Sequence, residues 1–328
     1  MNEAAKTSSA SPAAACICCG GHGESTLFSA PAFDGDGTRY TLVQCRHCGL
    51  ARTEPRPSGE ALAGYYAPDY YGSGERKFHP LLERFIAALT ARRARALLTL
   101  AGTGTDAAAR VLDVGCGRGT LLGAFHSLGC ECHGVERVDF PLDRLAPGVR
   151  LHRGELDALA LPEAHFDVVV YWHVLEHLPA PFESLAQARR LLRPGGILAV
   201  AVPNLASLQA SLFEAHWFHL DLPRHLYHFP LATLRTHLAT TGYEVVHAST
   251  WSADQNVFGF VQSALNVLSP RRANRLYALL RRPAGARAAL LSWSLAALVL
   301  MPAALAEALV AGVLGRGATA TLYARRAA

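Results

Sequence analysis

Short apolar runs recur through residues 106–250 and alternate with stretches whose apolar residues have helical spacing. Runs of about four to eight apolar residues are typical of buried strands. The runs that we assign to strands span 111–114, 131–135, 149–152, 166–170, 197–202 and 243–250. Strands that alternate with helices predict a parallel α/β sheet with helices on both faces.

Two other stretches also have strong apolar patterns. Residues 78–100 repeat apolar side chains at helical spacing while their arginines mostly fall on the opposite face, which predicts an amphipathic helix. Residues 288–306 contain no charged residue and are barely long enough to cross a bilayer. Pro302 interrupts this run, arginines flank it on both sides, and residues 319–324 after it are typical of a strand.

A glycine loop follows the first predicted strand. Gly115, Gly117 and Gly119 lie between that strand and a helix predicted to begin at Thr120. Glycines let the backbone approach a ligand closely, and a helix start presents free N–H groups, so this is a nucleotide-binding geometry. Dinucleotide sites prefer G-x-G-x-x-G, whereas this loop is G-x-G-x-G with Asp113 beside it. An acidic group there would repel a pyrophosphate and suits a ligand that carries an ammonium and a sulfonium, such as S-adenosylmethionine.

Candidate cofactor contacts follow the next strands. Glu136 ends the second strand about 20 residues past the loop, where a carboxylate can bind both ribose hydroxyls. Glu155 follows the third strand and can accept a hydrogen bond from the adenine amino group. His173 leaves the carboxyl end of the fourth strand, where functional groups gather in open α/β sheets. We predict that all three side chains contact the cofactor.

Two C-x-x-C pairs near the N-terminus predict a metal site. Cys16 and Cys19 form the first pair, and Cys45 and Cys48 form the second about 25 residues later. Zn²⁺ prefers four tetrahedral thiolates, and two such knuckles at the ends of short hairpins supply them. Four thiolates leave no open coordination position, so we predict a structural zinc. Cys18 is a surplus that can replace either member of the first pair.

Histidines gather after two of the strands. His177 leaves the fourth strand beside Glu176, and His225 and His228 follow the fifth. Methyl transfer from a sulfonium is an in-line displacement, and a histidine can remove the proton of an acceptor hydroxyl. Each of the three histidines is therefore a candidate general base. Two alternatives stay open, because Glu176 and the histidines can instead hold a divalent metal, or Glu176 and His177 can simply bind the loop backbone.

The segments between residues 106 and 250 resemble class I S-adenosylmethionine-dependent methyltransferases. The resemblance rests on residues 111–122, the Phe-Asp-Val-Val strand, the Val-Leu-Glu-His element, the Leu-Arg-Pro-Gly-Gly turn and the Val-Pro-Asn sequence at 202–204. It is closer to bacterial members with an N-terminal zinc-binding segment, often associated with polysaccharide or lipid-linked glycan biosynthesis. Their Cys-Gly-Leu knuckle, Tyr-Tyr pairs and Pro-Arg-His-Leu-Tyr-His-Phe element are matched at 48–50, 65–71 and 223–229.

The resemblance implies both a fold and a site. The fold is a doubly wound, seven-stranded, mostly parallel α/β sheet of Rossmann-like type, whose last strand is antiparallel and lies beside the sixth. The implied cofactor residues are Asp113, Gly115, Gly117, Glu136, Glu155 and Leu156. If residues 319–324 are the last strand, both ends of the apolar segment belong to one domain, and a single membrane crossing is excluded. We therefore expect a hydrophobic helical hairpin, within an insertion at about 256–315, that lies in the membrane interface or packs on the domain.

Composition narrows the class of protein. The chain has 328 residues, 51% of them hydrophobic and 17% charged, which excludes a mainly disordered chain. Its net charge of +5 comes almost entirely from arginine, since Lys6 and Lys77 are the only lysines. A charge spread over a whole chain is weak support for nucleic-acid binding. The N-terminus lacks the apolar segment of a secretory signal, and eight cysteines without disulfide spacing fit a reducing compartment.

These features predict four parts: a disordered lead (1–15), a zinc-ribbon-like unit (16–54), a helical linker or cap (55–105) and a methyltransferase domain (106–328). We expect O-methylation of a sugar or other hydroxyl on a lipid-linked or apolar acceptor. We also expect a cytoplasmic protein, peripheral at the inner face of the membrane through residues 285–315, whose basic residues favour anionic headgroups. The same apolar surface is compatible with a homo-oligomer. The alternatives are an RNA methyltransferase that uses the zinc ribbon for recognition, and a zinc-bearing membrane adaptor without enzymatic activity.

Overall fold

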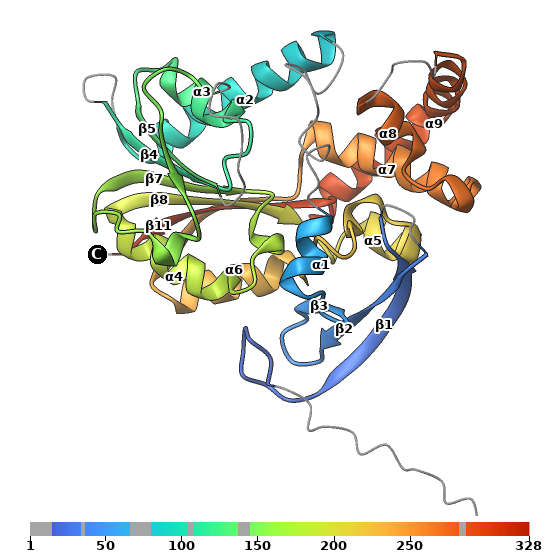
Figure 1. The fold of residues 1–328 in the computed structure, drawn as a ribbon, viewed down its shortest axis with the longest axis horizontal. Coiled ribbons are helices and arrows are strands. Elements are labelled where there is room, and N and C mark those ends of the chain that lie inside the picture. Colours follow the sequence, from blue (N-terminus) through green and yellow to red (C-terminus); the bar gives the residue numbers. More distant parts are fainter. Residues whose placement is uncertain are drawn as a thin grey trace, which may run out of the picture.

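A seven-stranded sheet forms the centre of the molecule (Figure 1). The computed structural model describes residues 15–33, 37–65, 80–103, 108–136, 145–281 and 287–327. The strand order is β10–β11–β8–β7–β4–β5–β6, and only β11 runs antiparallel to its neighbours. The strands are β4 (Arg110–Val114), β5 (Glu131–Glu136), β6 (Arg150–Arg153), β7 (Phe166–Trp172), β8 (Leu192–Pro203), β10 (Tyr243–Ser249) and β11 (Thr319–Arg326). This confirms the predicted doubly wound α/β fold, including the antiparallel last strand between the fifth and the sixth.

Helices cover both faces of this sheet (Figure 1). Helices α2 (Pro80–Leu100) and α3 (Thr120–His126) lie on one face, and α4 (Pro181–Leu191) and α6 (Leu231–Thr240) lie on the other. Successive side chains of β7 point to opposite faces, so Val168 and Val170 join the core under α2 and α3 while Val169 joins the core over α4. A strand buried on both faces needs apolar residues throughout, which is why the predicted strands appear as unbroken runs.

One predicted turn lies inside a strand. Residues 193–196 belong to β8, but the pairing with β7 jumps from Phe166–Leu192 to Val168–Ile197. The four residues between the paired positions therefore form a bulge at the start of β8. Gly195 adopts a φ of +76° there, which is why the Pro-Gly-Gly sequence looks like a turn.

The N-terminal cysteines belong to a second, four-stranded sheet. Its order is β1 (Glu24–Pro31), β2 (Arg39–Cys45), β3 (Ala51–Glu54) and β9 (Tyr227–His228), with the short helix α1 (Gly59–Gly64) following β3. Strand β9 comes from the segment between β8 and α6, so the N-terminal sheet incorporates part of the central domain. Residues 1–14, which make up most of the predicted lead, and Tyr66, Tyr70 and Tyr71 lie outside the described residues.

The insertion between β10 and β11 is a group of helices at one end of the sheet (Figure 1). It contains α7 (Ala253–Leu268), α8 (Arg275–Arg281) and α9 (Arg287–Val313), and α5 (Leu208–Phe213) packs against α7. Short 3-10 turns lie at Leu156–Ala158, Leu175–His177, Glu214–His216, Phe218–Leu220 and Pro270–Arg272. The expected interruption at Pro302 is wrong, because α9 continues through this residue. Proline removes one backbone hydrogen bond, and the packing of Ala304, Ala308 and Ala311 holds the following turns in place.

Helix α9 is long and apolar enough to cross a membrane by length and composition. The stretch Ala288–Val313 has a mean hydropathy of 2.0, and 17% of its most apolar window is buried within the protein. Because α9 leads into β11 of the central sheet, its C-terminal end is fixed to the domain. The insertion therefore stays attached to one folded body at both of its ends.

Candidate functional site

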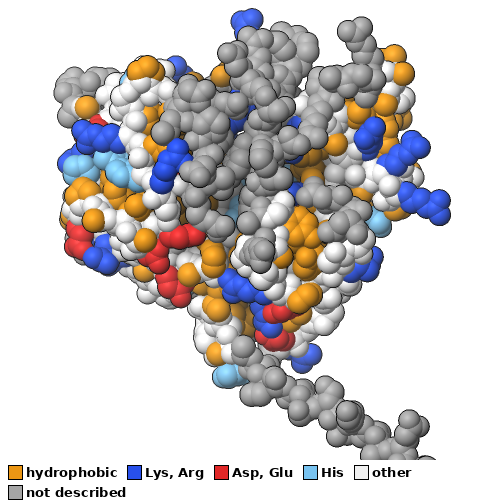
Figure 2. Space-filling view, viewed as in Figure 1, with side chains coloured by type: hydrophobic (Ala, Val, Ile, Leu, Met, Phe, Trp, Pro, Cys, Tyr) orange, Lys and Arg blue, Asp and Glu red, His pale blue; other side chains and the backbone are white. Residues whose placement is uncertain are grey.

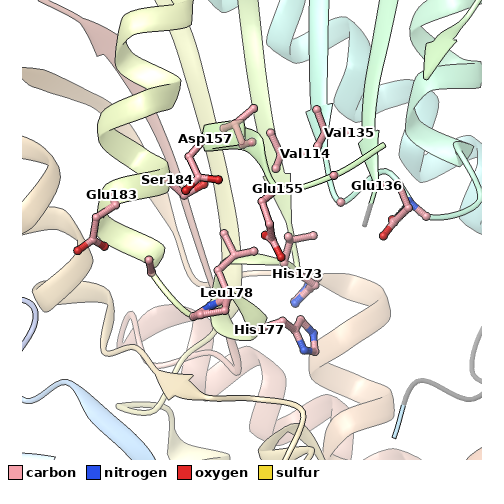
Figure 3. A pocket seen from close by; sticks show the side chains of 17 residues that line it. Val114, Val135, Glu136, Glu155, Asp157, His173, His177, Leu178, Glu183 and Ser184 are labelled. Carbon is pink, nitrogen blue, oxygen red and sulfur yellow. Dashed lines mark hydrogen bonds between the residues drawn. The ribbon is translucent and has the colours of Figure 1, made fainter. Parts of the chain in front are cut away.

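A cavity of about 390 Å³ opens at the carboxyl ends of β4, β5 and β7. The predicted cofactor residues that line it are Gly115, Gly117, Glu136, Glu155, Leu156 and His173. Figure 3 shows Glu136 and Glu155 at this cavity, with His173 and His177 next to one another where the chain leaves β7. Asp113 and Gly119 are not among its lining residues. The structure thus gathers six of the eight predicted cofactor residues around one space.

The glycine loop forms the floor of this cavity. Gly115 has a φ of +70°, and a Cβ atom there would lie 2.5 Å from Cγ2 of Val174, so no other residue fits without a rearrangement. The Gly117 N–H donates a hydrogen bond to Oε2 of Glu136 over 2.9 Å. The loop therefore holds the Glu136 carboxylate at the cavity.

Asp113 lies beneath the loop and is buried. Burial, and then the charge of Glu136, raise the pKa of Asp113 to about 8. A buried carboxylate next to a second carboxylate favours a cationic ligand over a phosphate. This agrees with the predicted preference for an ammonium and a sulfonium.

A second cavity, of about 730 Å³, adjoins the first. It extends from the turn after β7 to the helices of the insertion. Its walls combine apolar side chains of α2, α7, α8 and α9 with polar ones from the turn after β7 and from residues 219–225. His173 and His177 line both cavities. The two spaces therefore meet at these histidines.

Glu176 is the most deeply buried charged side chain at this junction. It is 1% exposed, and neither carboxylate oxygen has a hydrogen-bond partner among the described residues. Its Oε1 lies 3.5 Å from Nδ1 of His173 and 3.9 Å from Nε2 of His225. Ligand atoms of Glu176, His177 and His225 all lie within 4.8 Å of one another. A buried carboxylate that lacks hydrogen bonds is costly, so this cluster is arranged for a proton, a cation or a polar group of a ligand.

The tautomers of the two histidines follow from their backbone contacts. Nδ1 of His177 donates to the carbonyl oxygen of Arg224 over 3.0 Å, and Nδ1 of His225 donates to that of His219 over 3.0 Å. In a neutral imidazole the lone pair is then on Nε2. Burial, and then the neighbouring His177, hold the pKa of His225 well below its ordinary value. Each ring can therefore bind a cation through Nε2, whereas the lowered pKa makes His225 a poor proton acceptor.

The sequence profile described as a methyltransferase domain matches residues 82–248. This chain belongs to the methyltransferase-domain family. A ubiquinone biosynthesis O-methyltransferase of Cereibacter sphaeroides is 31% identical over 128 residues, which cover 35% of this chain and 50% of that protein. One of Maricaulis maris is 29% identical over 130 residues, which cover 37% of this chain and 51% of that protein. This chain thus spans about half the length of these curated relatives.

Solved structures are similar over a larger part of the chain. An S-adenosylmethionine-dependent methyltransferase from Archaeoglobus fulgidus superposes with a TM-score of 0.46 at 18% identity, and covers 73% of this chain and 94% of that one.

His228 lies apart from both cavities of the methyltransferase domain. It is in β9, where its Nε2 lies 3.1 Å from Oγ1 of Thr53, and burial lowers its pKa to about 3. Thr53 Oγ1 also donates to the carbonyl oxygen of His225 over 2.6 Å. Of the three candidate bases, the structure brings His177 and His225 to the junction and places His228 in the N-terminal sheet.

The four predicted zinc ligands lie together. Sγ of Cys16 is 3.6 Å from that of Cys48, Sγ of Cys19 is 3.8 Å from that of Cys45, and all four sulfurs are within 4.8 Å of one another. A tetrahedral site with Zn–S bonds of about 2.3 Å requires sulfurs separated by about 3.8 Å. The spacing fits a bound zinc, and Cys18 is not part of this group.

Sequence patterns did not reveal the walls of the larger cavity. His219 lines this cavity, and its carbonyl oxygen accepts the hydrogen bond from Nδ1 that orients His225. Phe85 and Ile86 of α2 lie opposite Phe258 and Leu298 of the insertion only in the folded chain. Their one signal in sequence is that α2 and α9 carry more apolar residues than a single packed face needs.

Proposed function

We propose that this protein is an S-adenosylmethionine-dependent O-methyltransferase that acts on a hydroxyl group of an apolar acceptor. The cofactor binds in the 390 Å³ cavity and the acceptor in the 730 Å³ cavity. A sugar or another hydroxylated headgroup on a lipid is the acceptor class that we favour. The named activity of the ubiquinone-pathway relatives supports an acceptor of apolar character.

The observation that carries the proposal is the junction at His173 and His177. Methyl transfer needs the acceptor oxygen on the line of the breaking bond, so the two ligands must meet end to end. The two cavities share His173 and His177 as lining residues, so ligands in the two cavities would meet end to end at these histidines. When bound, S-adenosylmethionine supplies an electrophilic methyl group on a sulfonium.

In this proposal His177 is the general base. Its Nδ1 proton is held by the Arg224 carbonyl, so Nε2 can take the proton of the acceptor hydroxyl. The acceptor oxygen would bond to the methyl carbon as the methyl–sulfur bond breaks, and the neutral thioether would leave. Glu176 lies close enough to His177 to stabilise the imidazolium that forms. Its carboxylate is available for this contact, because neither oxygen has a hydrogen-bond partner in the described part of the chain. His225 faces the same carboxylate and positions it.

A divalent cation at Glu176, His177 and His225 is the second candidate for the same cluster. The orphaned buried carboxylate favours it, because a cation would satisfy both oxygens and two imidazole nitrogens at once. These residues would then orient the acceptor oxygen instead of removing its proton. Dialysis against a chelator separates the two candidates. If a cation binds at this cluster, dialysis lowers turnover and added Mg²⁺ or Mn²⁺ restores it, whereas with a general base these ions restore nothing.

We also propose that the four clustered cysteines hold a structural zinc, as their spacing supports. Apolar cavity walls favour a lipid over RNA as the acceptor, and an intact cofactor cavity favours an enzyme over an adaptor. We place the protein in the cytoplasm at the inner face of the membrane, on the basis of its apolar insertion.

The test is transfer of tritiated methyl from S-adenosylmethionine to fractionated cell extracts. We expect label in the lipid fraction with the natural protein and a large loss with His177→Gln. Label in RNA would overturn the acceptor assignment. No binding of S-adenosylmethionine in a calorimetric titration would overturn the enzymatic function itself.

A further inference from the structure

Helix α9 has two different apolar faces. One face packs on α7, where Ala304, Ala308 and Ala311 are completely buried. The other face, which we call the outer face, is exposed and carries Leu291, Leu295, Leu298, Leu305, Leu309 and Val313. These residues recur three, four or seven positions apart, so they form one continuous stripe along the helix. Isolated exposed leucines need no explanation, but a stripe of this length indicates a surface that is covered by something apolar.

The larger cavity reaches this outer face. Leu298 and Met301 of α9 line the cavity together with Glu176 and His177 at its far end. Leu298 is also 65% exposed. A side chain that contacts both the cavity and the solvent marks a mouth, so the cavity opens on the outer face of α9.

The surroundings of this mouth are basic. Residues 251–316 contain seven arginines and two acidic residues, Asp254 and Glu307. Glu307 is turned inward and accepts a hydrogen bond from Nε2 of Gln209 over 2.9 Å. Arg271 and Arg272 are exposed between α7 and α8, and Arg275 is exposed at the start of α8. Figure 2 shows Lys and Arg side chains next to hydrophobic ones on this part of the molecule. An apolar stripe bordered by cations matches an anionic bilayer surface, where acyl chains lie beneath phosphate headgroups.

We propose that α9 lies in the surface of an anionic bilayer and that the hydrocarbon chain of the acceptor passes from the bilayer, beside Leu298, into the cavity. The hydroxyl group of the acceptor then reaches His177 while its chain stays between α2 and the insertion. This rests on the proposed function for its chemistry, but the docking of α9 and the occupation of the cavity are separate physical claims. The insertion is thus both the membrane contact and a wall of the acceptor site.

The first experiment measures flotation of the full chain with vesicles. The natural protein floats with phosphatidylcholine/phosphatidylglycerol vesicles and less with phosphatidylcholine alone. Leu309 is 64% exposed on the outer face and does not line the cavity. Leu309→Glu places a charge on the docking surface and therefore abolishes flotation, while the cavity keeps its lining. Leu128 is an exposed leucine after α3, far from α9, and Leu128→Glu floats like the natural protein. Equal flotation of both variants overturns the docking claim. The claim is also overturned if the natural protein does not float and instead forms a dimer that Leu309→Glu dissociates.

The second experiment measures the cavity with a dansyl-labelled long-chain alcohol, whose fluorescence increases in an apolar site. Ala297 lines the cavity and is not on the outer face, so Ala297→Trp fills the space and abolishes the fluorescence increase without reducing flotation. Ser294→Phe reports on the same space if Ala297→Trp does not fold. Unchanged probe binding in the folded variant overturns chain entry.

Neither experiment needs turnover. Calorimetric titration with S-adenosylmethionine is run in parallel on every variant and is expected to be unchanged. If the cofactor fails to bind the natural protein, the proposed function fails, while flotation and probe binding still decide this inference.

Discussion

Asp113 and Glu136 place two carboxylates side by side under the glycine loop, and Asp113 is buried. Such a pair destabilises the protein without ligand, because burial removes water from the Asp113 carboxylate and the neighbouring charge is the like charge of Glu136. A ligand with a positive charge relieves the penalty on binding. A strongly perturbed pKa of this kind is common at functional sites.

Asp113→Asn is expected to stabilise the protein without ligand. The pKa of Asp113 is raised from 3.8 to about 8, so the native state binds more protons than the unfolded state between these values. The unfolding free energy therefore falls as the pH rises from about 4 to about 8. At about pH 7 the substitution raises it by on the order of 2–4 kcal/mol and weakens S-adenosylmethionine binding.

Urea denaturation at about pH 5, 7 and 8 measures this difference, which should grow with pH. Asp157→Asn is the matched control, because Asp157 is exposed and lines the same cavity. A destabilising effect of Asp113→Asn at neutral pH would contradict the prediction.

The histidines at the junction and in the N-terminal sheet have different expected roles. His177→Gln should lower kcat about 10²–10⁴-fold with little change in cofactor affinity, as expected for loss of a general base. His228→Gln should instead lower the unfolding free energy by about 1–2 kcal/mol, because it removes the contact with Thr53. Most of kcat should remain, because His228 lines neither cavity. Steady-state kinetics and denaturation of both variants check this, with the exposed His126→Gln as the control. Equal kcat losses at His177 and His126 would contradict the role of His177.

At the scale of elements, the N-terminal sheet positions the segment that carries His225. Strand β3 pairs with β9, and the Thr53 N–H donates to the carbonyl oxygen of Leu226 over 3.1 Å. On the other side, Thr233 Oγ1 donates to the carbonyl oxygen of Cys48, which connects the cysteine cluster to α6. The N-terminal sheet and the cysteine cluster are therefore connected to β9 and α6, the two elements that follow His225 in the chain.

Thr53→Val is expected to weaken this connection. It removes the hydrogen bond to the His225 carbonyl and leaves a buried acceptor unpaired, which costs about 1–3 kcal/mol. We expect a lower kcat and unchanged cofactor binding, since the cofactor cavity contains no residue of the N-terminal sheet. Thr41→Val, at a half-buried position in β2 of the same sheet, is the matched control in kinetics and calorimetry. A loss of cofactor affinity with Thr53→Val would argue against a positioning role.

At the scale of the whole molecule, the cysteine cluster and the methyltransferase domain are expected to unfold together. Strand β9 belongs to the N-terminal sheet but lies between β8 and α6 in the chain, so neither body is complete without the other. Scanning calorimetry should show a single transition, and a strong chelator should lower its temperature as a whole. Two separate transitions, of which only one responds to the chelator, would contradict this coupling.

The sequence could predict those parts that depend on local patterns. Buried strands need unbroken apolar runs, a close backbone approach needs glycine, and zinc needs paired thiolates, so the sheet, Gly115 and Cys16 with its partners were all recognisable before folding. Nothing local distinguishes His225 from His228, because only two residues lie between them in one motif.

Only the tertiary structure decided that His225 lines the larger cavity while His228 supports a sheet. It also decided that Leu298 borders both the solvent and a cavity that ends at Glu176. The physical reason is that a cavity is formed by side chains far apart in sequence, whose apolar character alone does not say whether they fill a core or surround a space. The apolar and polar pattern thus determined the fold and the glycine loop, and packing determined which side chains surround each cavity.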